Sequence, residues 1–181
     1  MGMPDTIRWT RDQVLNLPGD GNRYELVDGE LVVTPAPTWH HQRVLAAILR
    51  VIDPYLEAGG FGHVLWSPAD LELESGQLTQ PDIFVLPGSG PVQRWEEAPR
   101  PLLVIEALSP STARYDRGLK RRFYQRAGVP EYWIVDIDAR VVERWRPDDS
   151  RPEVLDATLE WAPLEGVPAL VIAVPSLFEA S

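Results

Sequence analysis

Residues 100–110, RPLLVIEALSP, form an almost unbroken apolar run that constrains the fold more than any other part of this 181-residue chain. Such a run is typical of a strand at the centre of a sheet that is covered on both faces. Alternation along the strand places Ile105 and Ala107 on one face and Val104 and Glu106 on the other. A carboxylate among apolar neighbours is costly to bury unless it is paired or binds a metal, so Glu106 is a candidate functional residue. The alternative is that Glu106 ends the strand and emerges into solvent.

The other patterns predict an α/β (α+β mixed) domain in which helices flank a mixed sheet. Helices are expected at 10–17, 38–60 and 115–127, each bounded by capping residues, glycine or proline. Two hairpins are expected, YELVDGELVV around an Asp-Gly turn and EYWIVDI with ARVVERWR. Further strands are expected for GHVLWS paired with ADLELES, for PDIFVLPG, and more weakly near VLDA and PALVIAV. The Gly/Pro-rich segment 87–101 is expected to be an exposed loop.

Composition excludes several classes of protein. The chain is 44% hydrophobic and 24% charged, which suits one globular domain over residues 1–181. It contains no cysteine, which rules out disulfides, thiolate catalysis and zinc ribbons. The absence of an apolar leader or a long apolar stretch favours a cytoplasmic protein that does not contact membranes. A net charge of −10 argues against indiscriminate nucleic-acid binding but leaves room for a local basic face.

Lysine is used once, at Lys120, against sixteen arginines. A desolvated lysine can shift its pKa and place a compact charge where arginine cannot, so a single retained lysine suggests a specific task. Asp82 follows Pro81 at the head of PDIFVLPG, and with Glu106 it would place two carboxylates on neighbouring strands. Hard oxygen ligands of this kind favour Mg²⁺ over Zn²⁺. The alternatives are an ordinary turn aspartate and an ion pair between Lys120 and Asp116 one helical turn away.

Several motifs together resemble one known family. QPDIFVL, VIEALSPST, YDRGLKRRFYQRAGVPEYWIVD and VVERWR, preceded by YELVDGELVVTPAPTWHHQRV, are similar to the Uma2 family of restriction-type endonucleases. That family belongs to the PD-(D/E)XK nuclease superfamily, and the likeness spans most of residues 20–147. The resemblance implies a restriction-endonuclease-like core with extra hairpins, a helical arm at 1–20 and added strands at 148–181.

The resemblance also implies a catalytic set. Asp82 and Glu106 match the two carboxylates of the superfamily motif, and the backbone carbonyl of Ala107 would complete their metal site. The motif lysine is absent from its usual place, where this chain has Leu108. Lys120 on the following helix would then be a relocated catalytic lysine.

Further residues match the family more loosely. Glu25 would be an additional metal carboxylate, and His41 would face the substrate. Arg117, Arg121 and Tyr124 are expected to contact the substrate backbone. The alternatives are an exposed strand residue for Glu25, a helix terminus for His41 and core packing for Tyr124.

The activity implied is Mg²⁺-dependent hydrolysis of DNA, with Mn²⁺ as a substitute metal and a homodimer as the working form. RNA or single-stranded DNA as substrate is an open alternative. A second alternative is a non-catalytic binding or interaction module that keeps the nuclease fold, which the displaced lysine and the negative net charge would favour.

Overall fold

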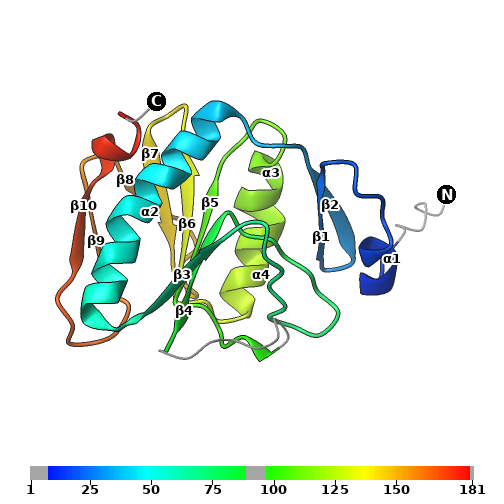
Figure 1. The fold of residues 1–181 in the computed structure, drawn as a ribbon, viewed down its shortest axis with the longest axis horizontal. Coiled ribbons are helices and arrows are strands. Elements are labelled where there is room, and N and C mark those ends of the chain that lie inside the picture. The colour runs from blue at the N-terminus through cyan, green and yellow to red at the C-terminus, as the bar shows by residue number, and fades with distance from the viewer. Residues whose placement is uncertain (1–7, 89–96, 180–181) are drawn as a thin grey trace.

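The computed structural model describes residues 8–88 and 97–179 (Figure 1). Within them, six strands form one mixed sheet in the order β3-β4-β5-β6-β7-β8. Two smaller antiparallel sheets, β1-β2 and β9-β10, pack against it. The strands are β1 (Arg23–Val27), β2 (Glu30–Thr34), β3 (Gly62–Trp66), β4 (Ile83–Pro87), β5 (Leu103–Ala107), β6 (Glu131–Asp136), β7 (Val141–Trp145), β8 (Glu153–Leu155), β9 (Thr158–Trp161) and β10 (Leu170–Ala173).

The apolar run found in the sequence is the central strand β5. It pairs antiparallel with β4, where Ile83 faces Ile105, and parallel with β6, where Ala107 faces Val135. All five residues of β5 are buried. Because β4 and β5 are antiparallel, the start of β4 and the end of β5 lie at the same end of the sheet, which places Asp82 beside Glu106.

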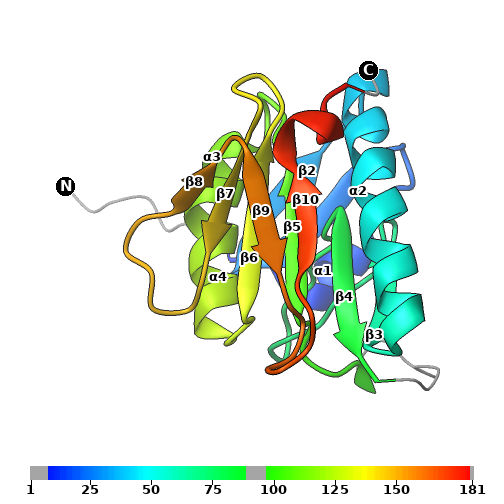
Figure 2. The same cartoon turned by 90° about the vertical axis from the view of Figure 1, so that its left-hand side faces the viewer.

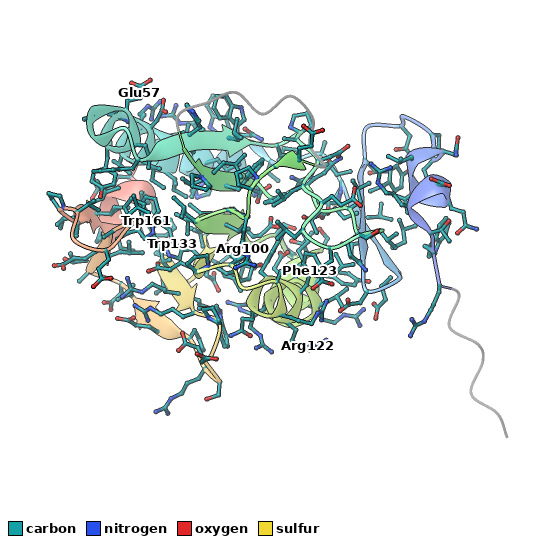
Figure 3. The ribbon with its side chains drawn as sticks, turned by 90° about the horizontal axis from the view of Figure 1, so that it is seen from below. Glu57, Arg100, Arg122, Phe123, Trp133 and Trp161 are labelled. Carbon is teal, nitrogen blue, oxygen red and sulfur yellow. The ribbon has the colours of Figure 1, made fainter. Side chains whose placement is uncertain are left out.

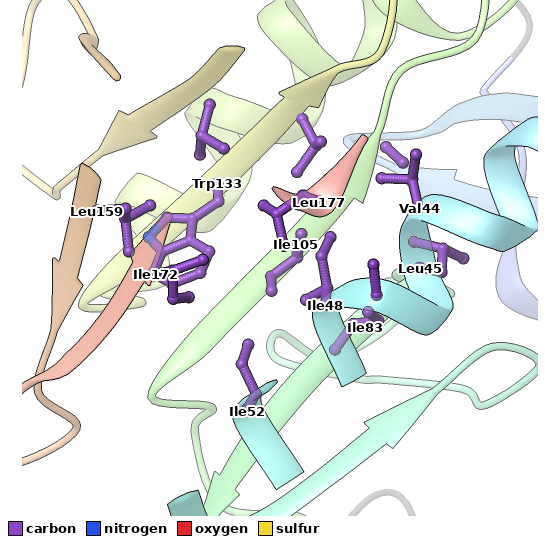
Figure 4. Close-up of a cluster of buried hydrophobic side chains, with 14 of the residues drawn as sticks. Val44, Leu45, Ile48, Ile52, Ile83, Ile105, Trp133, Leu159, Ile172 and Leu177 are labelled. Atoms are coloured by element: carbon purple, nitrogen blue, oxygen red, sulfur yellow. The ribbon is translucent and has the colours of Figure 1, made fainter. Parts of the chain in front are cut away.

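One face of the sheet is covered by α2 (Trp39–Gly59) and by β9-β10. Thr38 caps α2 by accepting a hydrogen bond from the backbone N–H of His41, and Gly60 ends the helix in the left-handed conformation. Figure 4 shows Ile48 and Ile52 of α2 facing Ile105 of β5. Burying each such side chain contributes about 1.5–3 kcal/mol, so this face anchors the helix firmly.

Tryptophans join the C-terminal strands to the same core. The rings of Trp133 on β6 and Trp161 on β9 meet edge to face with centroids 5.9 Å apart, and Figure 3 shows them side by side. Tyr55 on α2 donates its hydroxyl to the carbonyl of Pro168 at 2.7 Å. Residues 153–177 are therefore part of the same packed unit as the main sheet.

The opposite face of the sheet is covered by a helical stretch over residues 113–126, so that the sheet lies between α2 and this stretch (Figure 2). The stretch consists of α3 (Ala113–Tyr115), a π-helical turn (Asp116–Lys120) and α4 (Arg121–Arg126). A π turn widens the helix locally and is often found at functional sites. Its buried residues include Asp116 and Lys120, which face the sheet with Phe123 of α4.

Most expected elements are confirmed, with several differences. The first hairpin turns at Asp28 and Gly29, both with positive φ, and α1 (Arg11–Leu15) is shorter than predicted. ADLELES is not a strand, because β3 pairs with β4 instead. The strand β9 was not predicted. The expected loop 87–101 falls largely outside the described residues.

Among the described residues, no helix is both long and apolar enough to span a membrane.

Candidate functional site

A cavity of about 440 Å³ opens where β4 begins, β5 ends and α2 starts. Side chains from strands and helices on both faces of the sheet reach its wall. Among the residues that line it are Arg23, His41, Asp82, Glu106, Ala107, Asp116 and Lys120. Carboxyl ends of strands at the centre of an α/β sheet are the usual place for a binding site.

Asp82 is buried and held from three sides. Its Oδ1 accepts from Arg23 Nη1 at 2.9 Å, and its Oδ2 accepts from the backbone N–H of Ala107 at 3.0 Å. His41 Nε2 lies 3.1 Å from the same Oδ2. Burial raises the pKa of Asp82, but its contacts with His41, the charge of Arg23 and the Ala107 N–H outweigh that effect and lower the pKa below its ordinary value. Asp82 is therefore ionised at neutral pH.

Glu106 is also buried, at 2% exposure, so it does not emerge into solvent at the end of its strand. Its Oε1 accepts from Lys120 Nζ at 2.9 Å, and its Oε2 lies 3.4 Å from the backbone N–H of Asp82. Burial raises the pKa of Glu106 well above its ordinary value, although the charge of Lys120 opposes the rise. The two carboxylates of the site thus have pKa values displaced in opposite directions.

Lys120 is surrounded by carboxylates. Its Nζ lies 2.7 Å from Glu25 Oε2 and 3.6 Å from Asp116 Oδ1, in addition to its bond with Glu106. Burial lowers the pKa of Lys120, but the three carboxylates outweigh burial and raise it well above the ordinary value. Burial likewise raises the pKa of Asp116, with Lys120 opposing. The ion pair between Lys120 and Asp116, which was the alternative to a functional lysine, is present, but it is one part of a larger buried network.

The charge of this network does not balance. The carboxylates of Glu25, Asp82, Glu106 and Asp116 face two permanent cations, Lys120 and Arg23, which leaves two negative charges when all four are ionised. Uncompensated buried charge is costly, so the site is suited to one divalent cation.

The donor atoms of the site fit such an ion only in part. Asp82, Glu106 and the carbonyl of Ala107 supply the hard oxygens that Mg²⁺ binds. However, Glu106 Oε1 is held by Lys120. Across the described ranges, no three or more His, Cys, Asp or Glu side chains are grouped so as to hold a metal ion. A metal at this edge would therefore depend on a backbone oxygen as well as on side chains.

Three residues predicted to contact substrate lie elsewhere. Arg117 Nη2 is 2.6 Å from both Asp136 and Glu143, and the guanidinium of Arg121 stacks 4.7 Å from the centre of the Trp145 ring. Neither arginine lines the cavity. Tyr124 is fully buried in the core, as the packing alternative expects, and its contact with substrate stays a prediction.

Two members of the network were missed as functional residues. Arg23 stands two residues before Glu25 on β1, and this spacing places both on one face of the strand. Asp116 was weighed only as an ordinary partner of Lys120. Trp39 and Trp66 are exposed at the surface, and Trp95 lies outside the described residues.

Comparisons with known proteins identify the family and the fold. The Uma2 family model, described as "Putative restriction endonuclease", matches residues 11–175. A solved structure from Anabaena variabilis, "a putative nuclease belonging to DUF820", aligns with a TM-score of 0.72 over 95% of this chain and 98% of that chain, at 22% identity. At this identity the likeness establishes a shared fold. No curated protein matches the chain.

Proposed function

The chain belongs to the Uma2 family, and we propose that it is a metal-dependent endonuclease that hydrolyses DNA phosphodiester bonds. The observation that carries the proposal is the convergence of Asp82, Glu106 and Lys120 at one cavity. Two carboxylates beside a buried lysine at a strand edge suit phosphodiester hydrolysis, in which negative charge builds on the phosphate.

In this proposal Asp82, Glu106 and the Ala107 carbonyl hold a divalent ion, Mg²⁺ or Mn²⁺. When bound, such an ion supplies Lewis-acid polarisation of the phosphate and a more acidic attacking water. Arg23 and the Ala107 N–H fix the carboxylate of Asp82 in one orientation and keep it ionised. This preorganisation would leave Asp82 ready to act without rearrangement.

Lys120 has two tasks in this proposal. Its ammonium group orients Glu106 through the 2.9 Å bond, and it places a positive charge at the cavity wall. The neighbouring carboxylates keep it protonated, as the raised pKa requires, so it acts as a fixed charge. It therefore stabilises charge on the phosphate and does not act as the base.

The path of the substrate follows two adjoining cavities. A second cavity of about 530 Å³ shares Arg23, Pro37 and Asp82 with the first, and exposed Trp66 stands at its wall. A nucleic-acid strand crossing from one cavity to the other would pass directly over Asp82. Trp66 could then stack against a base, a contact that tolerates any sequence.

One observation favours the rival function, a non-catalytic module. Lys120 is 1% exposed and neutralised by three carboxylates, which is also what a purely structural ion-pair network would require. A nuclease should lose cleavage when either Asp82 or Glu106 is replaced, because catalysis needs both carboxylates in place. A non-catalytic module has no cleavage to lose.

The test is cleavage of supercoiled plasmid and of single-stranded DNA with Mg²⁺, Mn²⁺ or EDTA. Wild type is compared with Asp82→Ala, Glu106→Ala and the matched surface control Glu165→Ala. We expect metal-dependent cutting in wild type and in the control, and none in the site variants. Cutting that persists in both site variants would remove this site from consideration. No cutting by the folded wild type would favour the binding module.

A further inference from the structure

At the start of α2, a histidine nitrogen lies close to two of the oxygen atoms that were assigned above to the metal site. His41 Nε2 lies 3.1 Å from Asp82 Oδ2 and 3.1 Å from the carbonyl oxygen of Ala107. The three atoms come from α2, the start of β4 and the end of β5, and all three residues line the main cavity. His41 itself is 6% exposed.

This arrangement allows two roles for His41 Nε2, as a hydrogen-bond donor or as an unprotonated nitrogen with a free lone pair. With a proton on Nε2, one N–H is shared between a carboxylate and a carbonyl, both of which only accept hydrogen bonds. With the proton on Nδ1, three lone pairs face one another, and a cation is needed between them. Nδ1 is buried and has no hydrogen-bond partner among the described residues, so the polar contacts that position the ring are made through Nε2.

The spacing of the atoms matches neighbouring ligands on one metal ion. An octahedral ion with bonds of roughly 2.1–2.2 Å holds adjacent ligand atoms roughly 3 Å apart. The separations of His41 Nε2 from Asp82 Oδ2 and from Ala107 O are both 3.1 Å. When the four carboxylates of the surrounding network are ionised, their two uncompensated negative charges supply the electrostatic attraction.

We propose that His41 is a metal ligand, which together with Asp82 Oδ2 and the Ala107 carbonyl makes a mixed nitrogen and oxygen site that prefers Mn²⁺ to Mg²⁺. An imidazole nitrogen suits transition ions, whereas Mg²⁺ favours oxygen alone and keeps its water. The inference deepens the proposed nuclease and rests on its metal site. It replaces the earlier expectation that His41 faces the substrate.

The chain supplies its own control. His63 on β3 is exposed and is not among the residues that line the main cavity. His63→Ala therefore reports on the loss of an imidazole outside the cavity. His41→Gln keeps a side-chain N–H able to donate to the Ala107 carbonyl, so it rescues a role limited to hydrogen bonding. It does not supply an imidazole nitrogen to a metal.

The experiment measures Mn²⁺ and Mg²⁺ binding calorimetrically in the absence of nucleic acid, and nitrogen coupling to bound Mn²⁺ by pulsed electron paramagnetic resonance. Wild type should bind Mn²⁺ more tightly than Mg²⁺ and show imidazole coupling. His41→Ala and His41→Gln should weaken Mn²⁺ binding at least tenfold and lose the coupling, while the control variant His63→Ala behaves as wild type. Urea unfolding confirms that each variant is folded.

Failure of the His41 assignment can be distinguished from failure of the proposed nuclease function. Unchanged Mn²⁺ affinity in His41→Ala, restored affinity in His41→Gln, or no nitrogen coupling in wild type would overturn the assignment of His41, even if plasmid cleavage depends on Glu106. No metal binding by wild type would overturn it as well. Histidine-dependent Mn²⁺ binding without cleavage of any nucleic acid would support the metal site and count against the nuclease.

Discussion

Replacing Lys120 with methionine tests the buried charge network most directly. Methionine has a similar length and fills the space with apolar atoms, so the change removes one charge with little change in packing. It leaves Glu25, Glu106 and Asp116 without the cation that lies 2.7, 2.9 and 3.6 Å from them. Removing one partner of a buried ion pair costs about 3–5 kcal/mol. Against a total stability of about 5–15 kcal/mol, that is a large loss.

The size of the loss should depend on pH and on Glu25. Burial raises the pKa values of Glu106 and Asp116, so these two carboxylates take up protons more readily as pH falls and then need no cation. Lys120→Met should therefore lose less stability near pH 5 than at pH 7. In the Lys120→Met background, replacing Glu25 with glutamine removes one of the unpaired negative charges and should recover part of the lost stability. We therefore expect Lys120→Met/Glu25→Gln to be more stable than Lys120→Met alone at pH 7.

Urea unfolding followed by tryptophan fluorescence measures these free energies in metal-free buffer, and a double-mutant cycle isolates the coupling between Lys120 and Glu25. The reasoning is refuted if Lys120→Met unfolds within about 0.5 kcal/mol of wild type at pH 7, a size typical of surface changes. A coupling near zero between Lys120 and Glu25, despite their 2.7 Å separation, would refute it equally.

Three further predictions concern chemistry and packing. Lys120→Arg should lose nearly all cleavage, because the planar guanidinium does not fit a site built for a compact ammonium; full activity in a plasmid assay would show that charge alone suffices. Trp161→Ala should cost about 3–5 kcal/mol in urea unfolding, because it removes the partner of the Trp133 ring; a loss below 1 kcal/mol would mean that β9 is not part of the core. Burial raises the pKa of Glu131, which the Trp133 indole N–H only partly offsets, so the folded chain holds this proton more tightly than the unfolded chain. The stability of the protonated form is lost as pH rises through that pKa, and Glu131→Gln should therefore be more stable than wild type at pH 8 but not at pH 4; equal differences at both pH values would contradict this.

Short sequence patterns were sufficient to predict the central strand, the first hairpin and the start of α2. The apolar run around Glu106 predicted the central strand, Asp28-Gly29 predicted the first hairpin, and Thr38 marked the start of α2. Each of these depends on residues close together in the chain. The pairing of β3 with β4 instead of ADLELES depends on contacts between distant segments, which alternation alone does not specify.

The candidate site was predictable only as a set of residue types. Asp82, Glu106 and Lys120 could be named from motif and composition, and the structure brings them together. Their partners could not be named, because the contacts of Arg23 with Asp82 and of Glu25 with Lys120 join segments far apart in sequence. The ion pairs of Arg117 with Asp136 and Glu143 were unpredictable for the same reason, and a contact of Arg117 with a phosphate stays a prediction.

The π turn at Asp116–Lys120 contains one residue more than an α-helical turn, and Lys120 is its last residue. A turn that holds an extra residue can lose it and become an ordinary α-helix. A π turn absorbs one extra residue, so deleting Gly118 should restore an ordinary α-helix and leave α4 nearly in register on the sheet. Asp116 and Lys120 would then stand three residues apart instead of four, so the π turn sets the spacing between the lysine and its carboxylate partner on the same helix.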